Sequence, residues 1–459
     1  MIYSFLKIIV KLALKVFFRK ITVNNKHLLP KEGPLLVVAN HPNTFLDPLL
    51  IAVLLKQQVA FLTNASVFSN AFNKWLFSKF NMIPVYRKQD VKKGNPDNRK
   101  TFSKCYEYLA EEGTILIFPE GTSISERKLR QLKTGTARIA LGAEAQYGGK
   151  LGVKIASIGL NYSQPQRFRS EVLINITQAL NVQDYWESYS TDEAGTVNQL
   201  TDDIRKQLEE QMLITQNAEQ DRLRKQIEKL YRQTLSHQLD ANLDDKQEAF
   251  KLSQQIIDAV NFFQEYHPER FEQITRSIEN YFRKLAIIQM RDEVLSGFAG
   301  SKTLFYSTLK NWLFTLLGFP VYLYGYLHNY IPYILPSLIA DRITKEIEYR
   351  APIMLATGTF TFPLFYALQT YLVYLWTSSP WFTGAYLLSL PITGFFTWNF
   401  SFFLHSMRGK WKLLGLFRKR KELMELLISQ RKGIVQSLNQ ATSIYLQERG
   451  EKQQETEGR

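Results

Sequence analysis

Two uncharged stretches in the C-terminal part of the chain place the strongest constraint on how it can fold. Residues 353–376 (IMLATGTFTFPLFYALQTYLVYLW) and 381–404 (WFTGAYLLSLPITGFFTWNFSFFL) contain no acidic or basic side chain. An apolar segment of about 20 residues is long enough to cross the hydrocarbon core of a bilayer as a helix. Because only TSSP separates the two stretches, they predict a tight transmembrane hairpin.

The placement of basic residues supports a membrane and argues against nucleic acid. The chain has 57 Lys and Arg against 42 Asp and Glu, a net charge of +15. Residues 1–30 and 405–421 carry basic side chains and no acid, and both adjoin apolar sequence. Basic residues next to apolar segments meet anionic lipid headgroups, whereas a nucleic-acid face would spread its charge over a folded domain. We therefore expect a lipid bilayer as partner and no nucleic acid.

The same charges predict an orientation. Arg342, Lys345 and Arg350 precede the hairpin, and the basic run of residues 408–421 follows it. Basic loops stay in the cytoplasm. An even number of crossings then leaves both the N-terminal domain and the C-terminal end on the cytoplasmic face.

Two further segments adjoin the membrane in this interpretation. Residues 1–20 predict an amphipathic helix that lies in the membrane interface, with its lysines on one side. Residues 311–340 are apolar but are interrupted by His328-Asn329, Pro332 and Pro336. We expect that stretch to form a re-entrant or interfacial pair of segments, the alternative being two crossings. The membrane region as a whole is residues 303–405.

Residues 21–185 alternate strand-like and helix-like segments. Six apolar runs read as strands: 34–39, 59–63, 82–87, 114–118, 153–162 and 171–176. Helical patterns separate them over 44–56, 66–80, 97–111 and 132–146. Continuous apolar strands alternating with helices are typical of an α/β fold. We predict an α/β domain with a mixed sheet covered by helices.

The remaining segments carry no catalytic motif. Residues 186–302 are charged and helical in pattern, which predicts a helical arm that packs on the domain or reaches the membrane region. Residues 406–459 predict a basic cytoplasmic helix and a polar tail. The lone cysteine, Cys105, is interpreted as a small buried apolar residue. No P-loop, dinucleotide fingerprint or zinc spacing occurs.

One histidine is placed for chemistry. His41 directly follows the apolar run of residues 34–39, and ligand sites in α/β folds lie at the carboxyl ends of strands. On one helix, His41 and Asp47 would point about 240° apart, so His41 must lie in the loop. Asn43 or Thr44 could then cap the helix and bring Asp47 into its first turn. Asp47 would bind one imidazole nitrogen and leave the other as a base. The alternative is a structural histidine that caps a turn.

Three other stretches offer groups for an anionic ligand. TILIFPEGTSISE (residues 114–126) is a strand that ends in a turn with Glu120, Gly121 and Thr122. Exposed backbone amides in such a turn bind oxyanions. Arg87 ends NMIPVYR and suits a phosphate, and Lys133 precedes a helix start. Taken singly, each cation reads more readily as a solvated surface charge.

Together these stretches resemble the phospholipid/glycerol acyltransferase family over residues 20–185. Asn40, His41 and Asp47 match its first motif, Ile83 to Arg87 its second, and Phe118 to Thr122 its FPEGT motif. The five residues between His41 and Asp47, where four are usual, resemble the fungal glycerol-3-phosphate/dihydroxyacetone-phosphate branch. Ser157 stands where a fourth motif usually has proline, and Asn81 where glycine usually precedes the IPV piece.

The resemblance implies that His41 is the general base and that Asp47 orients it. It implies that four residues hold the glycerol-phosphate acceptor: Arg87, Glu120, Gly121 and Thr122. We expect Lys133 to assist at the phosphate. The expected activity is transfer of a fatty acyl group from a thioester to glycerol-3-phosphate, with 1-acylglycerol-3-phosphate or another lyso-lipid as the alternative acceptor. A non-catalytic membrane scaffold is a third possibility.

Because a thioester is already activated, direct attack by the hydroxyl needs no covalent intermediate. We expect no metal and no cofactor, only acyl-CoA or acyl-carrier protein as co-substrate.

Overall fold

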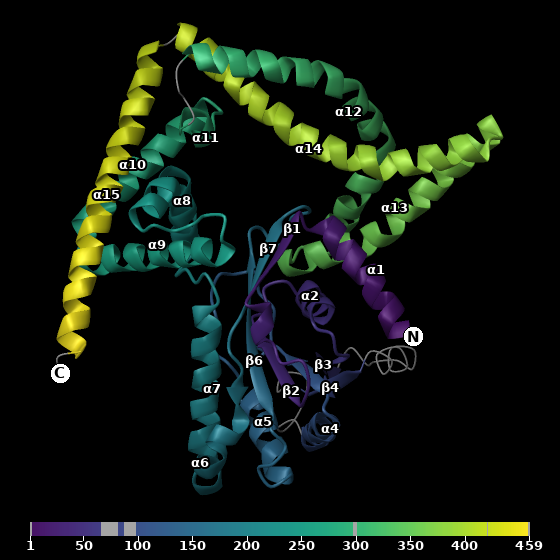
Figure 1. Ribbon diagram of the computed structural model, residues 1–459, viewed down its shortest axis with the longest axis vertical. Coiled ribbons are helices and arrows are strands. Elements are labelled where there is room, and N and C mark those ends of the chain that lie inside the picture. The colour runs from purple at the N-terminus through teal and green to yellow at the C-terminus, as the bar shows by residue number, and fades with distance from the viewer. Residues whose placement is uncertain (1, 66–80, 87–97, 297–300, 420, 458–459) are drawn as a thin grey trace. The chain divides into compact units, whose positions relative to one another are not determined.

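The computed structural model describes residues 2–65, 81–86, 98–296, 301–419 and 421–457 (Figure 1). The chain divides into two compact units. The first comprises Met1–Ile214 and Pro336–Thr359, and the second comprises Thr215–Leu335 and Phe360–Arg459. Arg87 and the predicted helix over 66–80 lie outside the described residues.

The first unit is built on one mixed sheet in the order β1-β7-β6-β2-β5-β3-β4, with β8 also paired to β6. Strand β6 runs parallel to β2 and antiparallel to β7 and β8. The α/β fold with a mixed sheet is therefore confirmed. The strands are β1 (Lys20–Asn24), β2 (Leu35–Ala39), β3 (Val59–Asn64), β4 (Met82–Val85), β5 (Thr114–Ile117), β6 (Lys154–Tyr162), β7 (Glu171–Ile176) and β8 (Leu180–Asn181).

Helices cover both faces of this sheet, and the central strand β2 shows why its sequence is apolar throughout. Leu35, Val37 and Ala39 point into one core cluster, and Leu36 and Val38 point into the other. A strand buried on both faces needs an unbroken apolar run. One cluster includes residues of α1 (Ile2–Phe17) and α2 (Leu46–Leu54); the other includes residues of α4 (Arg99–Ala110), α5 (Gly135–Gln146) and α7 (Glu193–Glu210). Short helices η1 (Lys26–Leu28), η4 (Val182–Tyr185) and α6 (Trp186–Thr191) complete this part of the unit.

The first cluster also contains residues from far along the chain. Ala351, Met354 and Leu355, at the start of α13 (Ile347–Thr377), are buried against it together with Leu14 and Phe17 of α1. Helix α1 still exposes Phe5, Ile8 and Leu12. The N-terminal helix is thus packed on the sheet by one face and leaves a second apolar face uncovered.

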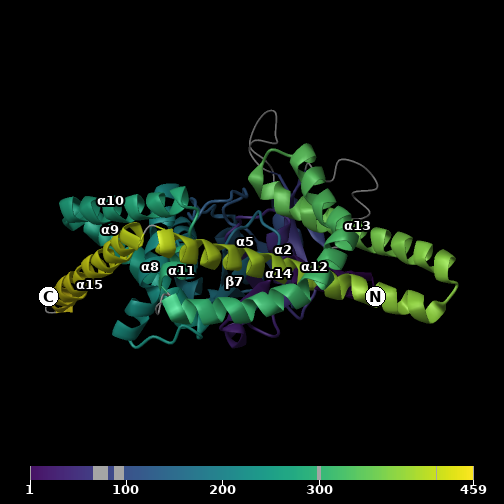
Figure 2. The same ribbon diagram turned by 90° about the horizontal axis from the view of Figure 1, so that it is seen from above.

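The predicted hairpin corresponds to α13 and α14 (Pro380–Lys419), which meet at a short turn (Figures 1 and 2). Among the described residues, Ile347–Thr377 and Pro380–His405 are two helices long and apolar enough to cross a membrane. Large apolar side chains such as Trp376, Trp381 and Leu388 are exposed on them.

The expected break before the hairpin is wrong. Helix α12 runs without interruption from Ser301 to Ile343 and includes Pro332 and Pro336. Proline cannot donate to the carbonyl four residues back, here that of His328. Gln369 Nε2 of α13 donates to the His328 oxygen instead, at 3.2 Å. A neighbouring helix thereby supplies the hydrogen bond that Pro332 removes.

The second unit also contains amphipathic helices that form their own core. Its helices are α8 (Ala218–Gln238), α9 (Lys246–Tyr266), α10 (Pro268–Ile287), α11 (Asp292–Ser296) and α15 (Lys421–Glu457). The first two are capped by Asn217 and Asp245, which accept backbone N–H groups. Residues 421–457, where a polar tail was expected, form one helix that buries Met424, Leu427 and Ile434 in this core.

Candidate active site

The loop after β2 is fixed to the neighbouring strand β6. Asn40, the first residue beyond β2, donates from Nδ2 to the Leu160 oxygen at 3.0 Å and accepts from the Leu160 nitrogen at 2.7 Å. Both functional groups of this buried amide are therefore satisfied. The next residue, His41, is held at the carboxyl end of the parallel strands.

His41 and Asp47 form a hydrogen-bonded pair. The distance between His41 Nδ1 and Asp47 Oδ2 is 2.9 Å. Asp47 lies in the first turn of α2 and is fully buried. Its carboxylate also accepts the Asn43 backbone N–H at 2.8 Å and the Tyr162 hydroxyl at 2.6 Å. Three donors thus fix the carboxylate that fixes the histidine.

The helix cap differs from the one expected. No side chain caps α2, and its N-cap residue is Phe45. The Asn43 side chain instead donates to the Pro165 oxygen at 2.9 Å, and the Asn43 oxygen accepts the Leu46 N–H. The Asp47 side chain accepts the buried Asn43 N–H and thereby ties the loop before α2 to the first turn of the helix.

The Phe118 ring stacks on the face of the His41 imidazole. The two rings are stacked with centroids 3.9 Å apart and planes 13° apart. The His41 side chain is 18% exposed, and its Nε2 has no hydrogen-bond partner among the residues that the structure describes. Nε2 is therefore the nitrogen available to a substrate.

Glu120 supports the loops on both sides of the site. Its Oε1 accepts the His41 backbone N–H at 2.9 Å, and its Oε2 accepts the Arg130 backbone N–H at 3.2 Å. Burial raises the pKa of this carboxyl, although both hydrogen bonds act in the opposite direction. Glu120 thus holds backbone that carries the histidine.

The turn after Glu120 brings a cation to the site. Gly121 has φ of +73°, a conformation that favours glycine. Lys133 Nζ lies 2.6 Å from the position that a Cβ on Gly121 would occupy. The Lys133 side chain is exposed and its backbone N–H bonds to the Pro119 oxygen at 2.9 Å. Thr122, next on the turn, is partly exposed.

The start of α13 forms a further wall of the site. Thr44 Oγ1 donates to the Glu348 oxygen at 2.9 Å, and the Ser125 N–H donates to Glu348 Oε1 at 3.0 Å. Tyr349 contacts Phe45 edge to face, with ring centroids 6.4 Å apart. The loop after β2 and the loop after β5 are therefore joined through Glu348.

Most of the site residues expected from sequence come together here. His41, Asp47, Glu120 and Gly121 are linked by the contacts above, with Lys133 over the turn. The sequence interpretation gave no role to Tyr162 or Glu348, and it named Phe118 only as part of a motif, without its contact to His41. Tyr162 ends an apolar strand beside β2, so the rule that placed His41 could also have found it. Nothing local to Glu348 indicates its position at the site.

The arrangement suits proton transfer. A buried carboxylate orients a partly exposed imidazole at the carboxyl edge of the sheet, and an ammonium group lies beside the turn after β5. Such a site can remove a proton from a hydroxyl whose molecule carries an anion. Residues 20–160 match the family model described as Acyltransferase. This part of the chain is an acyltransferase-family domain.

Curated relatives are glycerolipid enzymes of yeast. The chain is 23% identical over 321 residues to glycerol-3-phosphate O-acyltransferase 1 of Saccharomyces cerevisiae, covering 65% of this chain and 41% of that protein. It is 32% identical over 123 residues to glycerol-3-phosphate O-acyltransferase 2 of the same yeast, covering 27% of this chain and 16% of that one. The chain thus spans less than half the length of these relatives.

A solved structure is also similar. The crystal structure of the 1-acyl-sn-glycerophosphate acyltransferase from Thermotoga maritima aligns with 45% of this chain and 77% of its own, at 19% identity and a TM-score of 0.32.

Proposed function

We propose that this protein transfers a fatty acyl group from an acyl thioester to the hydroxyl of glycerol-3-phosphate. The observation that carries the proposal is the His41–Asp47 pair, in which a buried carboxylate 2.9 Å from Nδ1 leaves Nε2 open. The acyltransferase family match and the yeast glycerol-3-phosphate acyltransferases support the choice of reaction and acceptor.

His41 acts as the general base. Its Nε2 takes the proton of the acceptor hydroxyl as the oxygen attacks the thioester carbonyl. A C–O bond forms and the C–S bond breaks, and the imidazolium returns the proton to the departing thiolate sulfur. Asp47 holds Nδ1 as the donor and stabilises the imidazolium, as the aspartate of a serine-protease triad does. Phe118 keeps the ring plane fixed throughout.

The acceptor phosphate binds beside the turn of Gly121. Lys133 supplies a positive charge there, and Arg87 and Thr122 are further groups proposed to hold the phosphate. Fixing the phosphate aligns the hydroxyl with Nε2. This alignment lowers the activation barrier, because the reacting groups are already held in place. We propose Glu120 as a positioning residue that acts through the backbone of His41.

The site works at a membrane surface. The wall formed by Glu348 and Tyr349 belongs to α13, whose apolar length continues beyond the site. The exposed Phe5, Ile8 and Leu12 of α1 and the basic residues around the hairpin favour contact with the cytoplasmic leaflet. A membrane face suits a reaction whose product partitions into the bilayer.

The test is an acceptor panel with the full chain in nanodiscs and one labelled acyl-CoA. Glycerol-3-phosphate, dihydroxyacetone phosphate and lysophosphatidate are compared as rates. We expect glycerol-3-phosphate to give the highest kcat/KM, and we expect His41→Ala and Asp47→Asn to lower kcat by about 100- to 10,000-fold.

His27→Ala is the matched control, because His27 is exposed in η1 and makes no contact with the site. Its rate should equal that of the wild type. A folded His41→Ala protein that retains full transfer to every acceptor would disprove the mechanism. A preference for lysophosphatidate would retain the mechanism and reassign the acceptor.

A further inference from the structure

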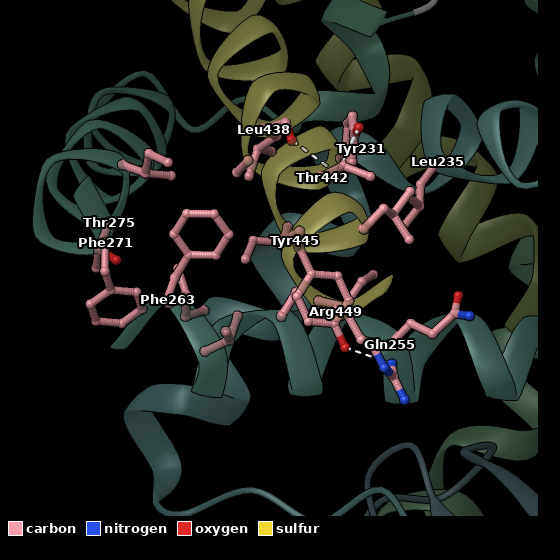
Figure 3. Close-up of a pocket in the computed structure, with 18 of the residues that line it drawn as sticks. Tyr231, Leu235, Gln255, Phe263, Phe271, Thr275, Leu438, Thr442, Tyr445 and Arg449 are labelled. Atoms are coloured by element: carbon pink, nitrogen blue, oxygen red, sulfur yellow. Dashed lines mark hydrogen bonds between the residues drawn. The ribbon is translucent and has the colours of Figure 1, made fainter. Parts of the chain in front are cut away.

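The second unit contains an apolar cavity. Helices α8, α9, α10 and α15 surround a volume of about 100 Å³ (Figure 3). Its lining is mostly aliphatic and aromatic, and includes Leu223, Ile227, Leu235, Ile256, Val260, Phe263, Phe271, Ile274, Leu438 and Ala441. An apolar cavity of this size stays dry and accepts hydrocarbon.

The hydroxyls of the two tyrosines in the lining are already engaged. The Tyr231 hydroxyl bonds to Gln238 at 2.7 Å and to Thr442 at 3.1 Å. The Tyr445 hydroxyl accepts from Arg449 Nη1 at 2.7 Å, and Figure 3 shows Arg449 beside it. A ligand deep in the cavity would therefore contact mainly carbon atoms, and it would not need to break the hydrogen bonds of these tyrosines.

The edge of the cavity is polar and carries a cation. Arg449 and Gln255 are exposed, and the guanidinium also lies over the Tyr445 ring, 5.7 Å from its centroid. Asp258 is an acid that interacts with Arg449. Burial raises the pKa of its carboxyl, and the charge of Arg449 lowers that pKa by a smaller amount. Glu448 is paired with His267. Arg449 uses one of its five N–H donors for Tyr445, which leaves others for a ligand.

We propose that this cavity binds one acyl chain that carries an anionic head, with the chain among the four helices and the head at Arg449. The small volume excludes a two-chain lipid and admits only one end of a single acyl chain, with the rest of the chain along the open edge of the cavity, since ordinary ligand pockets are several hundred Å³. The lining residues all belong to the second unit, so this site differs from the one at His41 and does not depend on the function proposed there.

The experiment uses photoactivatable oleic acid with the full chain in phosphatidylcholine nanodiscs, followed by mass spectrometry of the labelled peptides. We expect label on peptides of α9 and α15. Unlabelled competitors distinguish an anionic head from a neutral one. Oleate and oleoyl-lysophosphatidate should both reduce the labelling, and neutral monoolein should do so about two- to fivefold less well.

Two variants locate the chain and the head. Ala441→Leu fills the cavity and should reduce labelling of α9 and α15 about tenfold or more. Arg449→Gln should remove the preference for oleate over monoolein. Arg276→Gln is the matched control, because Arg276 pairs with Glu272 on exposed α10 surface and does not line the cavity. It should leave labelling unchanged.

Circular dichroism melting of each variant tests whether the helices remain folded. Label confined to peptides of residues 2–214, or label on α9 and α15 that is unchanged in a folded Ala441→Leu protein, would overturn the proposal. Equal competition by oleate and monoolein would overturn the role of Arg449. Labelling that persists in His41→Ala would show that the cavity is filled independently of catalysis.

Discussion

The Tyr162 hydroxyl, at the end of β6, donates to Asp47 in α2, and the Tyr162 side chain is buried. Burial and the Asp47 charge raise the pKa of this phenol well above 10.0, so it remains a donor at any working pH. Its hydrogen bond holds the Asp47 carboxyl in the orientation that bonds to His41.

Replacing Tyr162 by Phe should therefore slow catalysis. We expect kcat to fall about tenfold or more with KM nearly unchanged, because a hydrogen bond to a charged group contributes about 1.5–3 kcal/mol. Steady-state kinetics in nanodiscs measures this. Tyr185→Phe is the control, since its hydroxyl bonds to Asp203 at 2.7 Å away from the site. An equal loss of kcat in both variants would contradict the positioning role.

The Glu120 carboxyl leads to a prediction about how stability depends on pH. Burial raises the pKa of its carboxyl above 4.5, so the folded protein keeps this proton to a higher pH than the unfolded chain does. The associated stability is fully present below pH 4.5 and is lost as pH rises through the folded pKa. Glu120→Gln removes this dependence.

The protection that the wild type has over Glu120→Gln should therefore be largest near pH 4 and shrink toward neutral pH. Hydrogen exchange of peptides containing His41 and Arg130, corrected for intrinsic rates, measures it. A difference that grows with pH would refute the assignment. Because Gln offers one acceptor for two N–H groups, we also expect some loss of protection at pH 7.

At this scale the sequence predicted the contact between His41 and Asp47 but only part of its surroundings. His41 and Asp47 are six positions apart, so local geometry restricts them. The roles of Tyr162 and Phe118 depend on which strands become neighbours of β2, and strand order is set by packing of the whole sheet. The role of Glu120 in holding the acceptor stays a prediction; what the sequence did not indicate is that its oxygens accept two backbone N–H groups.

At the scale of elements, the backbone conformation of the turn after β5 determines where Lys133 lies at the proposed phosphate site. Gly121→Ala would place a methyl group in a left-handed conformation, at a cost of about 1–2 kcal/mol, and 2.6 Å from Lys133 Nζ. The flexible lysine must move. We expect KM for glycerol-3-phosphate to rise several-fold, with a smaller change in kcat.

Gly135→Ala is the control for that variant. Gly135 begins α5, and a Cβ there would have no atom within 4 Å. Alanine should be neutral or slightly stabilising at that position. If both variants give the wild-type KM, Lys133 does not act at the acceptor phosphate.

The elements themselves were largely predictable. The apolar strands 34–39 and 171–176 appear within a residue as β2 and β7, because burial on both faces demands an unbroken apolar pattern. The unbroken helix α12 was not predicted. A proline breaks a helix only when no neighbouring group donates a hydrogen bond to the carbonyl that the proline leaves unpaired. That neighbour, Gln369, lies 41 residues away from His328.

At the scale of the whole molecule, the first unit, which contains the acyltransferase-family residues 20–160, is discontinuous in sequence. It comprises Pro336–Thr359 as well as Met1–Ile214. Ala351, Met354 and Leu355 fill the core beside α1 and α2. No local sequence pattern distinguishes these residues from the apolar segment that follows them. For this reason the α/β domain was expected to end at residue 185, and residues 303–405 were expected to form a separate membrane region.

Residues 1–214 alone should therefore be less stable than the same fragment supplied with residues 336–359. Loss of the buried face of α13 exposes apolar core and removes both Glu348 contacts. We expect the lone fragment to be degraded faster in pulse proteolysis, and co-expression of the 336–359 segment to restore resistance. Equal resistance with and without that segment would show that the domain is complete without it.

The bond between Thr44 and Glu348 joins residues 304 positions apart. On a ribosome, the loop that carries His41 emerges long before the residue that holds it in place. The last piece of the first unit is therefore synthesised together with the first apolar turns of α13. If the hairpin enters lipid as proposed, we expect completion of the proposed active site and entry of the hairpin to fall in a single late step of biosynthesis.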